Sequence, residues 1–361
     1  MIPVTKPYLP NQQKYLQYIA GIYEREWLTN NGPLVQEFEQ QLKEYLQLEN
    51  LLYVNNGTIA LQIAIKALGL KGEIITTPFS YVATTSSIVW EGCEPVFVDI
   101  DEHTLNIDTS KIEAAITEKT SAILATHCFG NACDIEAIDV IAKKYNLKVI
   151  YDAAHCFATQ YKGKSIFEFG DISTCSLHAT KLMHSVEGGL VFAKEPEVIE
   201  RIAFMRNFGH DGPENFNGVG INGKNSELHA AMGHCVLNDI DIILKKRQEQ
   251  SEFYGEHLKG LSIKKQAIQG GCQYNYAYYP ILFKNEDSLL QVKFALEAEG
   301  INPRRYFYPS LNSLAYIEKR NNTHVSDDCA SRIICLPLYH SLNTDDQRKI
   351  CQIIKNVIEN G

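Results

Sequence analysis

The sequence is poor in the features that mark membrane, secreted and nucleic-acid-binding proteins. None of its apolar runs approaches the ~18–20 residues that a membrane-spanning helix requires. No apolar segment follows the first basic residue, Lys6, so we expect no signal peptide and a cytoplasmic protein without membrane contact. Acidic residues outnumber basic ones, 43 to 34, and no basic run stands out, so we expect no nucleic-acid partner.

Motifs of metal and hydrolytic sites are also missing. The ten cysteines include no CxxC pair, and neither HExxH nor GxSxG occurs. We therefore expect reduced thiols, no metal site and no serine-hydrolase nucleophile. One GxGxxG run, 218–223, matches the dinucleotide-binding fingerprint, but it follows a loop-like stretch where that fingerprint requires a strand. We do not assign it to dinucleotide binding.

The chain does contain the material for a large α/β protein. Its 361 residues correspond to roughly two domains of ~150 residues each. Helical and strand patterns alternate between about residues 33 and 245, which predicts parallel βαβ units, hence a mostly parallel sheet flanked by helices. The expected helices are 34–46, 58–68 and 134–145, and the expected strands are 51–54, 73–77, 94–99, 121–126, 147–152 and 188–193.

The pattern changes after about residue 245. A polar helix over 244–259 is followed by a strand near 277–283 and by a helix over 288–299 that ends at Gly300. We therefore predict a large α/β domain over 1–245 and a smaller C-terminal α+β domain over 246–361.

The turn 55–58 lies between an expected strand and an expected helix. A small glycine-containing turn at a helix N-terminus directs free N–H groups and the positive end of the helix dipole at one point, which suits a phosphate group. The alternative is an ordinary helix cap without a ligand, in which Thr58 satisfies the first turn.

Two further residues carry chemistry at expected strand ends. Asp152 ends an apolar strand, where open α/β sheets bind ligands, although such a carboxylate also caps turns. Lys181 lies in a weakly charged run just before another strand; kept from water, it becomes a nucleophilic amine, and otherwise it is a surface lysine. Together, a phosphate turn, a strand-end carboxylate and a lysine are the parts that a pyridoxal phosphate enzyme needs.

Motifs along nearly the whole chain resemble the DegT/DnrJ/StrS sugar aminotransferases, which are pyridoxal phosphate enzymes of fold type I, the aspartate aminotransferase-like fold. The matching segments are 27–33, 56–61, 78–84, 95–99, 152–155, 176–181, 187–189 and 220–227, and the sharpest of them are 152–155, 176–181 and 187–189. The resemblance implies pyridoxal 5'-phosphate as cofactor, with pyridoxamine phosphate formed between the two half-reactions.

The same resemblance implies roles for individual residues. Lys181 matches the lysine that binds the cofactor covalently and acts as general acid and base, and Asp152 matches the carboxylate that pairs with the pyridine nitrogen. The remaining cofactor contacts that the resemblance implies are Gly57, Thr58 and Ser176 at the phosphate, Tyr81 stacked on the ring, and His155 near the ring. Asn222 matches a residue that a partner subunit contributes to the phosphate, which implies a homodimer with shared active sites.

Within the family, segments 3–10, 27–30, 304–309 and 335–338 are similar to the dTDP-4-amino-4,6-dideoxyglucose transaminases. This similarity implies L-glutamate as donor, dTDP-4-keto-6-deoxy-D-glucose as acceptor, and a role in O-antigen or other lipopolysaccharide synthesis. The substrate contacts we expect are Thr29, Asn30, Lys224, Arg304, Arg305 and Tyr308, of which Arg304 and Arg305 suit a nucleotide diphosphate.

Other functions stay open at this point. A 3-keto or a UDP-linked sugar remains an alternative acceptor, and the dipeptide 224–225 departs from the Arg-Met or Lys-Met that is frequent in the family. A cofactor-binding regulator is a further alternative. A sugar dehydratase on the same fold is disfavoured because those enzymes carry histidine where this chain has Lys181.

Overall fold

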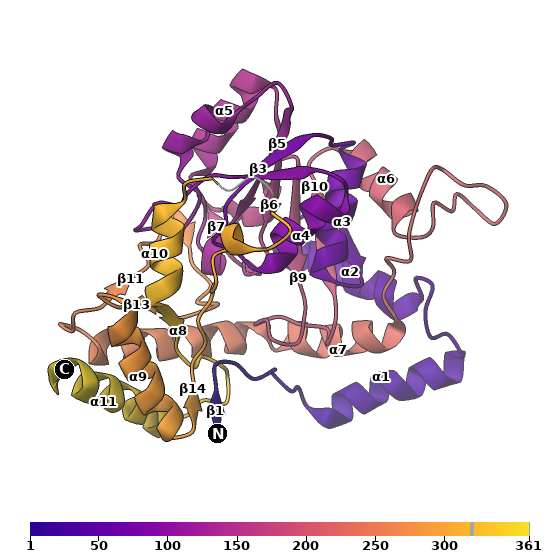
Figure 1. Ribbon diagram of the computed structural model, residues 1–361. Helices are drawn as coiled ribbons and strands as arrows, with labels where there is room; N and C mark the ends of the chain where they lie inside the picture. Colours follow the sequence, from indigo (N-terminus) through magenta and orange to yellow (C-terminus); the bar gives the residue numbers. More distant parts are fainter. Residues whose placement is uncertain (318–320, 361) are drawn as a thin grey trace.

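A seven-stranded sheet forms the centre of the molecule in the computed structural model, which describes residues 1–317 and 321–360 (Figure 1). Its spatial order is β2 (Leu51–Val54), β10 (Gly189–Ala193), β9 (Ile172–Ser176), β6 (Lys148–Asp152), β5 (Thr120–Thr126), β3 (Glu73–Thr76) and β4 (Glu94–Phe97). The five strands from β9 to β4 pair in parallel. The expectation of parallel units is wrong for β10, which pairs antiparallel with both neighbours.

Helices cover both faces of this sheet because its strands are apolar on both faces. In β2 all four residues are buried: Leu51 and Tyr53 pack into one core, and Leu52 and Val54 into the other. The first core also holds α2 (Pro33–Leu46) and α5 (Ile135–Tyr145). The second holds α3 (Gly57–Ala67), α4 (Val82–Trp90) and α6 (Pro196–Met205). The predicted helices and strands of this region are confirmed within a few residues of their expected ends.

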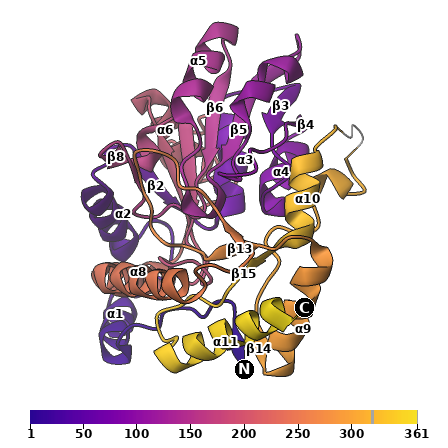
Figure 2. The ribbon, with the colours of Figure 1, turned by 90° about the vertical axis from the view of Figure 1, so that its left-hand side faces the viewer.

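The C-terminal part is smaller and is built on an antiparallel sheet. That sheet has the order β11 (Lys264–Lys265), β13 (Pro280–Leu282) and β15 (Ile333–Cys335). This sheet forms a third hydrophobic core of the molecule together with α8 (Ile240–His257), α9 (Glu286–Ala298) and α11 (Thr344–Asn360). Helix α10 (His324–Arg332) packs beside α9 (Figure 2). The predicted polar helix over 244–259, the strand near 277–283 and the helix over 288–299 are confirmed as α8, β13 and α9.

Several short elements tie the two parts together. The N-terminal β1 (Ile2–Pro3) pairs with β14 (Ile301–Asn302), and β12 (Cys272–Gln273) pairs with β7 (Gln160–Tyr161), which in turn pairs with β8 (Lys164–Ser165). The predicted boundary at residue 245 falls inside α8, and the division at that point stays a prediction.

Helices α1 (Gln12–Arg25) and α7 (Glu227–Asn238) and the loop before α7 lie outside the central sheet. Helix α7 runs into α8 below the sheet, and α1 packs against α7 (Figure 1). The loop 206–226, which contains the GxGxxG run, projects outward between α6 and α7 (Figure 1). The 3-10 helices are Thr109–Lys111, Glu113–Ala115, Cys128–Gly130, Ile166–Glu168 and Leu311–Ser313.

Two sequence expectations concern the chain as a whole. All ten cysteines lie in the described part, and none of them is paired in a disulfide there. Across residues 1–317 and 321–360, the structure has no helix with the length and apolar character needed to cross a membrane.

Candidate active site

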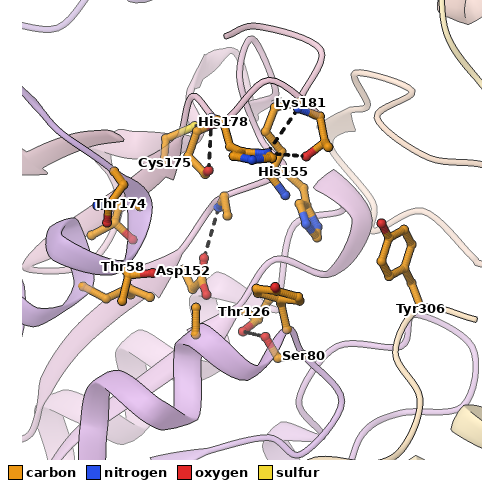
Figure 3. Close-up of a pocket in the computed structure, with 18 of the residues that line it drawn as sticks. Thr58, Ser80, Thr126, Asp152, His155, Thr174, Cys175, His178, Lys181 and Tyr306 are labelled. Carbon is orange, nitrogen blue, oxygen red and sulfur yellow. Dashed lines mark hydrogen bonds between the residues drawn. The ribbon is translucent and has the colours of Figure 1, made fainter. Parts of the chain in front are cut away.

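A cavity of about 580 Å³ opens at the carboxyl ends of the central strands, where it also meets residues of the C-terminal part (Figure 3). Strands β5, β6 and β9 supply Thr126, Asp152 and Ser176 as their last residues. The structure brings eight of the sequence-predicted site residues to this cavity: Gly57, Thr58, Tyr81, Asp152, His155, Ser176, Lys181 and Arg304. They come from five separate segments of the sequence.

The turn between β2 and α3 presents a helix N-terminus to the cavity. The helix cap is Asn56, whose side chain accepts a hydrogen bond from the Ile59 N–H at 2.8 Å, so the alternative in which Thr58 caps the helix is wrong. This leaves the N–H groups of Gly57 and Thr58 at the helix start, where an α-helix has no internal acceptors for them. Space is also limiting, because a Cβ on Gly57 would lie 3.0 Å from the Cβ of Ser176.

Asp152 is buried on the cavity floor, with 5% of its surface exposed. One carboxylate oxygen, Oδ2, accepts a hydrogen bond from the Thr84 hydroxyl at 2.6 Å, and the other accepts one from the Ala154 N–H at 3.1 Å. Burial raises the pKa of Asp152, while the two hydrogen bonds and the charge of Lys181 oppose that rise. The carboxylate is therefore costly to ionise and is held by few partners.

Lys181 lies across the cavity from Asp152. Loss of water around its amine lowers the pKa of Lys181, and the carboxylate of Asp152 partly offsets this effect. The amine Nζ donates a hydrogen bond to the Tyr278 hydroxyl at 3.5 Å. A lysine with a lowered pKa has a larger share of unprotonated, nucleophilic amine at neutral pH.

An aromatic wall closes one side of the cavity. His155 lies nearly parallel to Phe307, with ring centres 5.9 Å apart, and its ring centre is 4.8 Å from that of Tyr278. Burial lowers the pKa of His155 well below its ordinary value, which favours the neutral form of the ring. Its buried Nδ1 has no hydrogen-bond partner among the described residues. Figure 3 shows Tyr306 at this edge of the cavity, where it faces His155.

Arg305 and Tyr308 lie outside the cavity, although they were expected at the substrate. The guanidinium of Arg305 pairs with Glu286 at 2.6 Å, donates to the Ser331 carbonyl, and stacks on the Tyr308 ring at 3.5 Å. Arg305 is therefore engaged within the C-terminal part.

The other predicted residues outside the cavity lie on two neighbouring loops. Lys224 donates from Nζ to the exposed Asn222 at 3.0 Å. The loop with Asn222 is attached to the phosphate turn, because the Asn55 N–H donates to the Gly223 carbonyl at 2.9 Å. Thr29 and Asn30 follow Leu28, whose carbonyl accepts a hydrogen bond from the Glu227 N–H at 3.0 Å.

Several cavity residues were not predicted from the sequence. Ser80 and Thr126 line the floor, and Tyr278 and Phe307 line the wall beside Tyr306. The strand-end rule that selected Asp152 also applies to Thr126, since the two are paired in register at the ends of β5 and β6. Tyr278 and Phe307 carry no such signal, because the C-terminal part places them.

The fold of the chain is also found in solved structures of other proteins. The chain superposes on DesI, solved in the presence of its TDP-sugar product, with a TM-score of 0.93, 29% identity, and coverage of 98% of this chain and 92% of that one. The predicted fold class is thereby confirmed, and the chain shares the fold of a protein whose product is a TDP-sugar.

Sequence comparison then identifies the family. The DegT/DnrJ/EryC1/StrS aminotransferase family matches residues 11–355, and the chain belongs to this family. It is 42% identical over 360 residues to a dTDP-4-amino-4,6-dideoxy-D-glucose transaminase of Shigella dysenteriae, with 98% of each chain covered. It is 38% identical over 364 residues to the Escherichia coli protein of the same name, again with 98% of each covered. The predicted family and the prediction of a sugar aminotransferase are confirmed.

Proposed function

We propose that this aminotransferase uses pyridoxal 5'-phosphate to move an amino group from L-glutamate to dTDP-4-keto-6-deoxy-D-glucose, which gives dTDP-4-amino-4,6-dideoxy-D-glucose. The observation that carries the proposal is the placement of the Lys181 amine and the Asp152 carboxylate in one cavity, beside the N-terminus of α3. The names of the two relatives from Shigella dysenteriae and Escherichia coli support the choice of sugar.

The residues of the cavity fit the cofactor by their chemistry. The free N–H groups of Gly57 and Thr58, with the Ser176 hydroxyl, suit a phosphate, and Asp152 suits a protonated pyridine nitrogen. The buried, unpaired Nδ1 of His155 is a polar atom that a ligand can satisfy. When bound, pyridoxal phosphate supplies an electron sink for the carbon from which a proton is removed.

Three side chains of the cavity have separate roles in this proposal. Lys181 would hold the cofactor covalently, and its Nζ would move the proton to and from the donor carbon, a task that a lowered pKa suits. Tyr81, which is 56% exposed at the cavity mouth, would cover the cofactor. Asp152 would pair with the protonated pyridine nitrogen.

We further propose that the enzyme is a homodimer in which Asn222 and Lys224 serve the partner's cavity. Asn222 is exposed at the base of the projecting loop 206–226 and does not line its own cavity. The same loop exposes large apolar side chains, which suits burial against a second copy: Phe208, Phe216, Val219 and Ile221. Mixing inactive Lys181→Ala with weakened Asn222→Ala subunits tests this sharing. Hybrid dimers regain full activity at one of their two sites if each site draws on both chains, and keep only the weakened activity of Asn222→Ala if Asn222 serves its own chain.

The nucleotide-sugar enters from the open side of the cavity in this proposal. Arg304 is a cationic residue in the wall of the cavity, and its guanidinium lies 5.1 Å from the centre of the Tyr306 ring. We assign Arg304 to a phosphate of the nucleotide, with Arg305 and Tyr308 next to Arg304. Thr29 and Asn30 complete the substrate contacts from their neighbouring loop.

A coupled assay tests the function. The purified protein is incubated with pyridoxal phosphate, L-glutamate and dTDP-4-keto-6-deoxy-D-glucose, and the product is analysed by mass spectrometry and NMR. An amine on C4 is expected. Lys181→Ala should abolish it, whereas Lys194→Ala, at an exposed lysine after β10, should not.

The negative outcomes of this assay separate its parts. If glutamate changes the absorption of the bound cofactor but no product forms, the transaminase chemistry stands and the acceptor is wrong, which turns the test to 3-keto and UDP-linked sugars. If no cofactor absorption appears on the protein, the cofactor assignment fails.

A further inference from the structure

Three buried hydroxyl groups form a chain that ends on Asp152. Ser80 follows β3, Thr84 lies in the first turn of α4, and Thr126 ends β5. The Ser80 hydroxyl is 2.7 Å from that of Thr84 and 3.0 Å from that of Thr126, and Thr84 reaches Asp152 at 2.6 Å. All three side chains are at most 3% exposed. Figure 3 shows the Ser80–Thr126 bond at the base of the cavity.

The direction of these hydrogen bonds follows from the charge of Asp152. An ionised carboxylate only accepts, and each hydroxyl has a single proton to donate. Thr84 therefore donates to Asp152, so Ser80 must donate to Thr84, and Thr126 must in turn donate to Ser80. Hydrogen bonds aligned in one direction polarise and strengthen one another, and a donor to a charged acceptor forms the strongest bond of the chain.

We propose that Thr84, with Ser80 and Thr126 behind it, is a positioning residue that keeps Asp152 ionised and aimed into the cavity. The inference rests on the proposed function, in which Asp152 meets the pyridine nitrogen. Three adjacent parallel strands, β3, β5 and β6, end at this point, so the fold itself brings the hydroxyls to the carboxylate.

Few other groups around Asp152 favour its charged form. Lys181 does so by its positive charge, and the Ala154 N–H by a hydrogen bond. Burial lowers the pKa of His155 and raises the pKa of the nearby thiols of Cys128, Cys156 and Cys175, which favours the neutral form of each. Thr84 thus supplies one of only two direct hydrogen bonds to the Asp152 carboxylate among the described residues.

The chain offers a matched pair of variants. Thr84→Val keeps the shape of the side chain and removes the hydroxyl, and Thr84→Ser restores it. The control is Thr85→Val on the same helix: Thr85 is equally buried, but its hydroxyl has no hydrogen-bond partner in the described part of the chain. The hydrogen bond to a charged acceptor corresponds to about a ten- to hundredfold effect on cofactor affinity.

The experiment measures the dissociation constant of pyridoxal phosphate by dialysis of the holoenzyme at pH 6 and pH 8. We expect Thr84→Val to weaken binding relative to the native protein, and more so at pH 6, because loss of the donor makes Asp152 easier to protonate. Thr84→Ser should recover most of the affinity, and Thr85→Val should bind as the native protein does. In an Asp152→Asn background, Thr84→Val should add little, since its partner is already uncharged.

Each other outcome refutes a different step. If Asp152→Asn leaves the affinity unchanged, the proposed role of Asp152 fails, and this inference fails with it. If Asp152→Asn weakens binding but Thr84→Val behaves like Thr85→Val, only the inference fails. A loss in Thr84→Val that is equal at both pH values and persists in the Asp152→Asn background would assign Thr84 a merely structural role.

Discussion

Glu227 is a fully buried carboxylate that holds the start of another helix. Its two oxygens accept hydrogen bonds from the N–H groups of Leu34 at 3.1 Å and Val35 at 2.9 Å, in the first turn of α2. The cap residue of that helix, Gly32, has no side chain with which to do this. Glu227 therefore stands in for the missing cap from a position almost two hundred residues away in the sequence.

The cost of Glu227→Gln follows from this geometry. Glutamine keeps one acceptor oxygen, but its NH₂ group faces the second backbone N–H, which is left buried and unpaired at about 1–3 kcal/mol. Loss of the negative charge at the helix N-terminus adds about 0.3–1 kcal/mol. The ion pair with Arg25 adds little, because its 3.7 Å separation is long and the arginine is 38% exposed. We expect the free energy of unfolding to fall by about 1–4 kcal/mol.

Urea denaturation at a fixed protein concentration measures this loss. Glu37→Gln is the control, since Glu37 is exposed on the same helix, and it should change stability by less than ~0.5 kcal/mol. A Glu227→Gln protein within that margin of the native one would refute the argument.

Three other features lead to predictions. In Gly189→Ala the new Cβ would lie 2.4 Å from the Asn56 carbonyl oxygen. Thermal unfolding should therefore show a loss of stability of about 1–3 kcal/mol, and dialysis should show weaker binding of the cofactor. Arg206→Met leaves its buried partner Glu39 without a counter-charge and should cost about 3–5 kcal/mol in urea unfolding; a neutral result would contradict the buried pair. Because burial lowers the pKa of Lys181, the rate of cofactor uptake should rise with pH and level off below 10.5, the ordinary lysine value. A rate that still climbs through pH 10.5 would show an exposed amine.

Much of the fold was predictable because its strands and helices carry strong local patterns. Strand β2 and strand β6 are short apolar runs, and α5 begins at an acidic cap, Asp134, whose side chain accepts from the Ala137 N–H as such a cap should. The direction of β10 was not predictable in this way. Residues 189–193 are apolar on both faces whichever way the strand runs, so its antiparallel pairing depends on the path of the loop that carries Lys181.

The sequence by itself determined the chemistry at the carboxyl ends of the strands. The turn before Thr58, Asp152 and Lys181 each stand next to a strand, and the parallel part of the sheet brings strand ends to one edge, so local patterns sufficed to predict one site. Only the tertiary structure decided what surrounds these groups. Thr84 meets Asp152, Tyr278 meets Lys181, and Glu227 caps α2, each across 68 to 193 positions of sequence. Such contacts depend on how whole helices and loops pack, and packing is a property of three-dimensional distance that no local spacing of residues encodes.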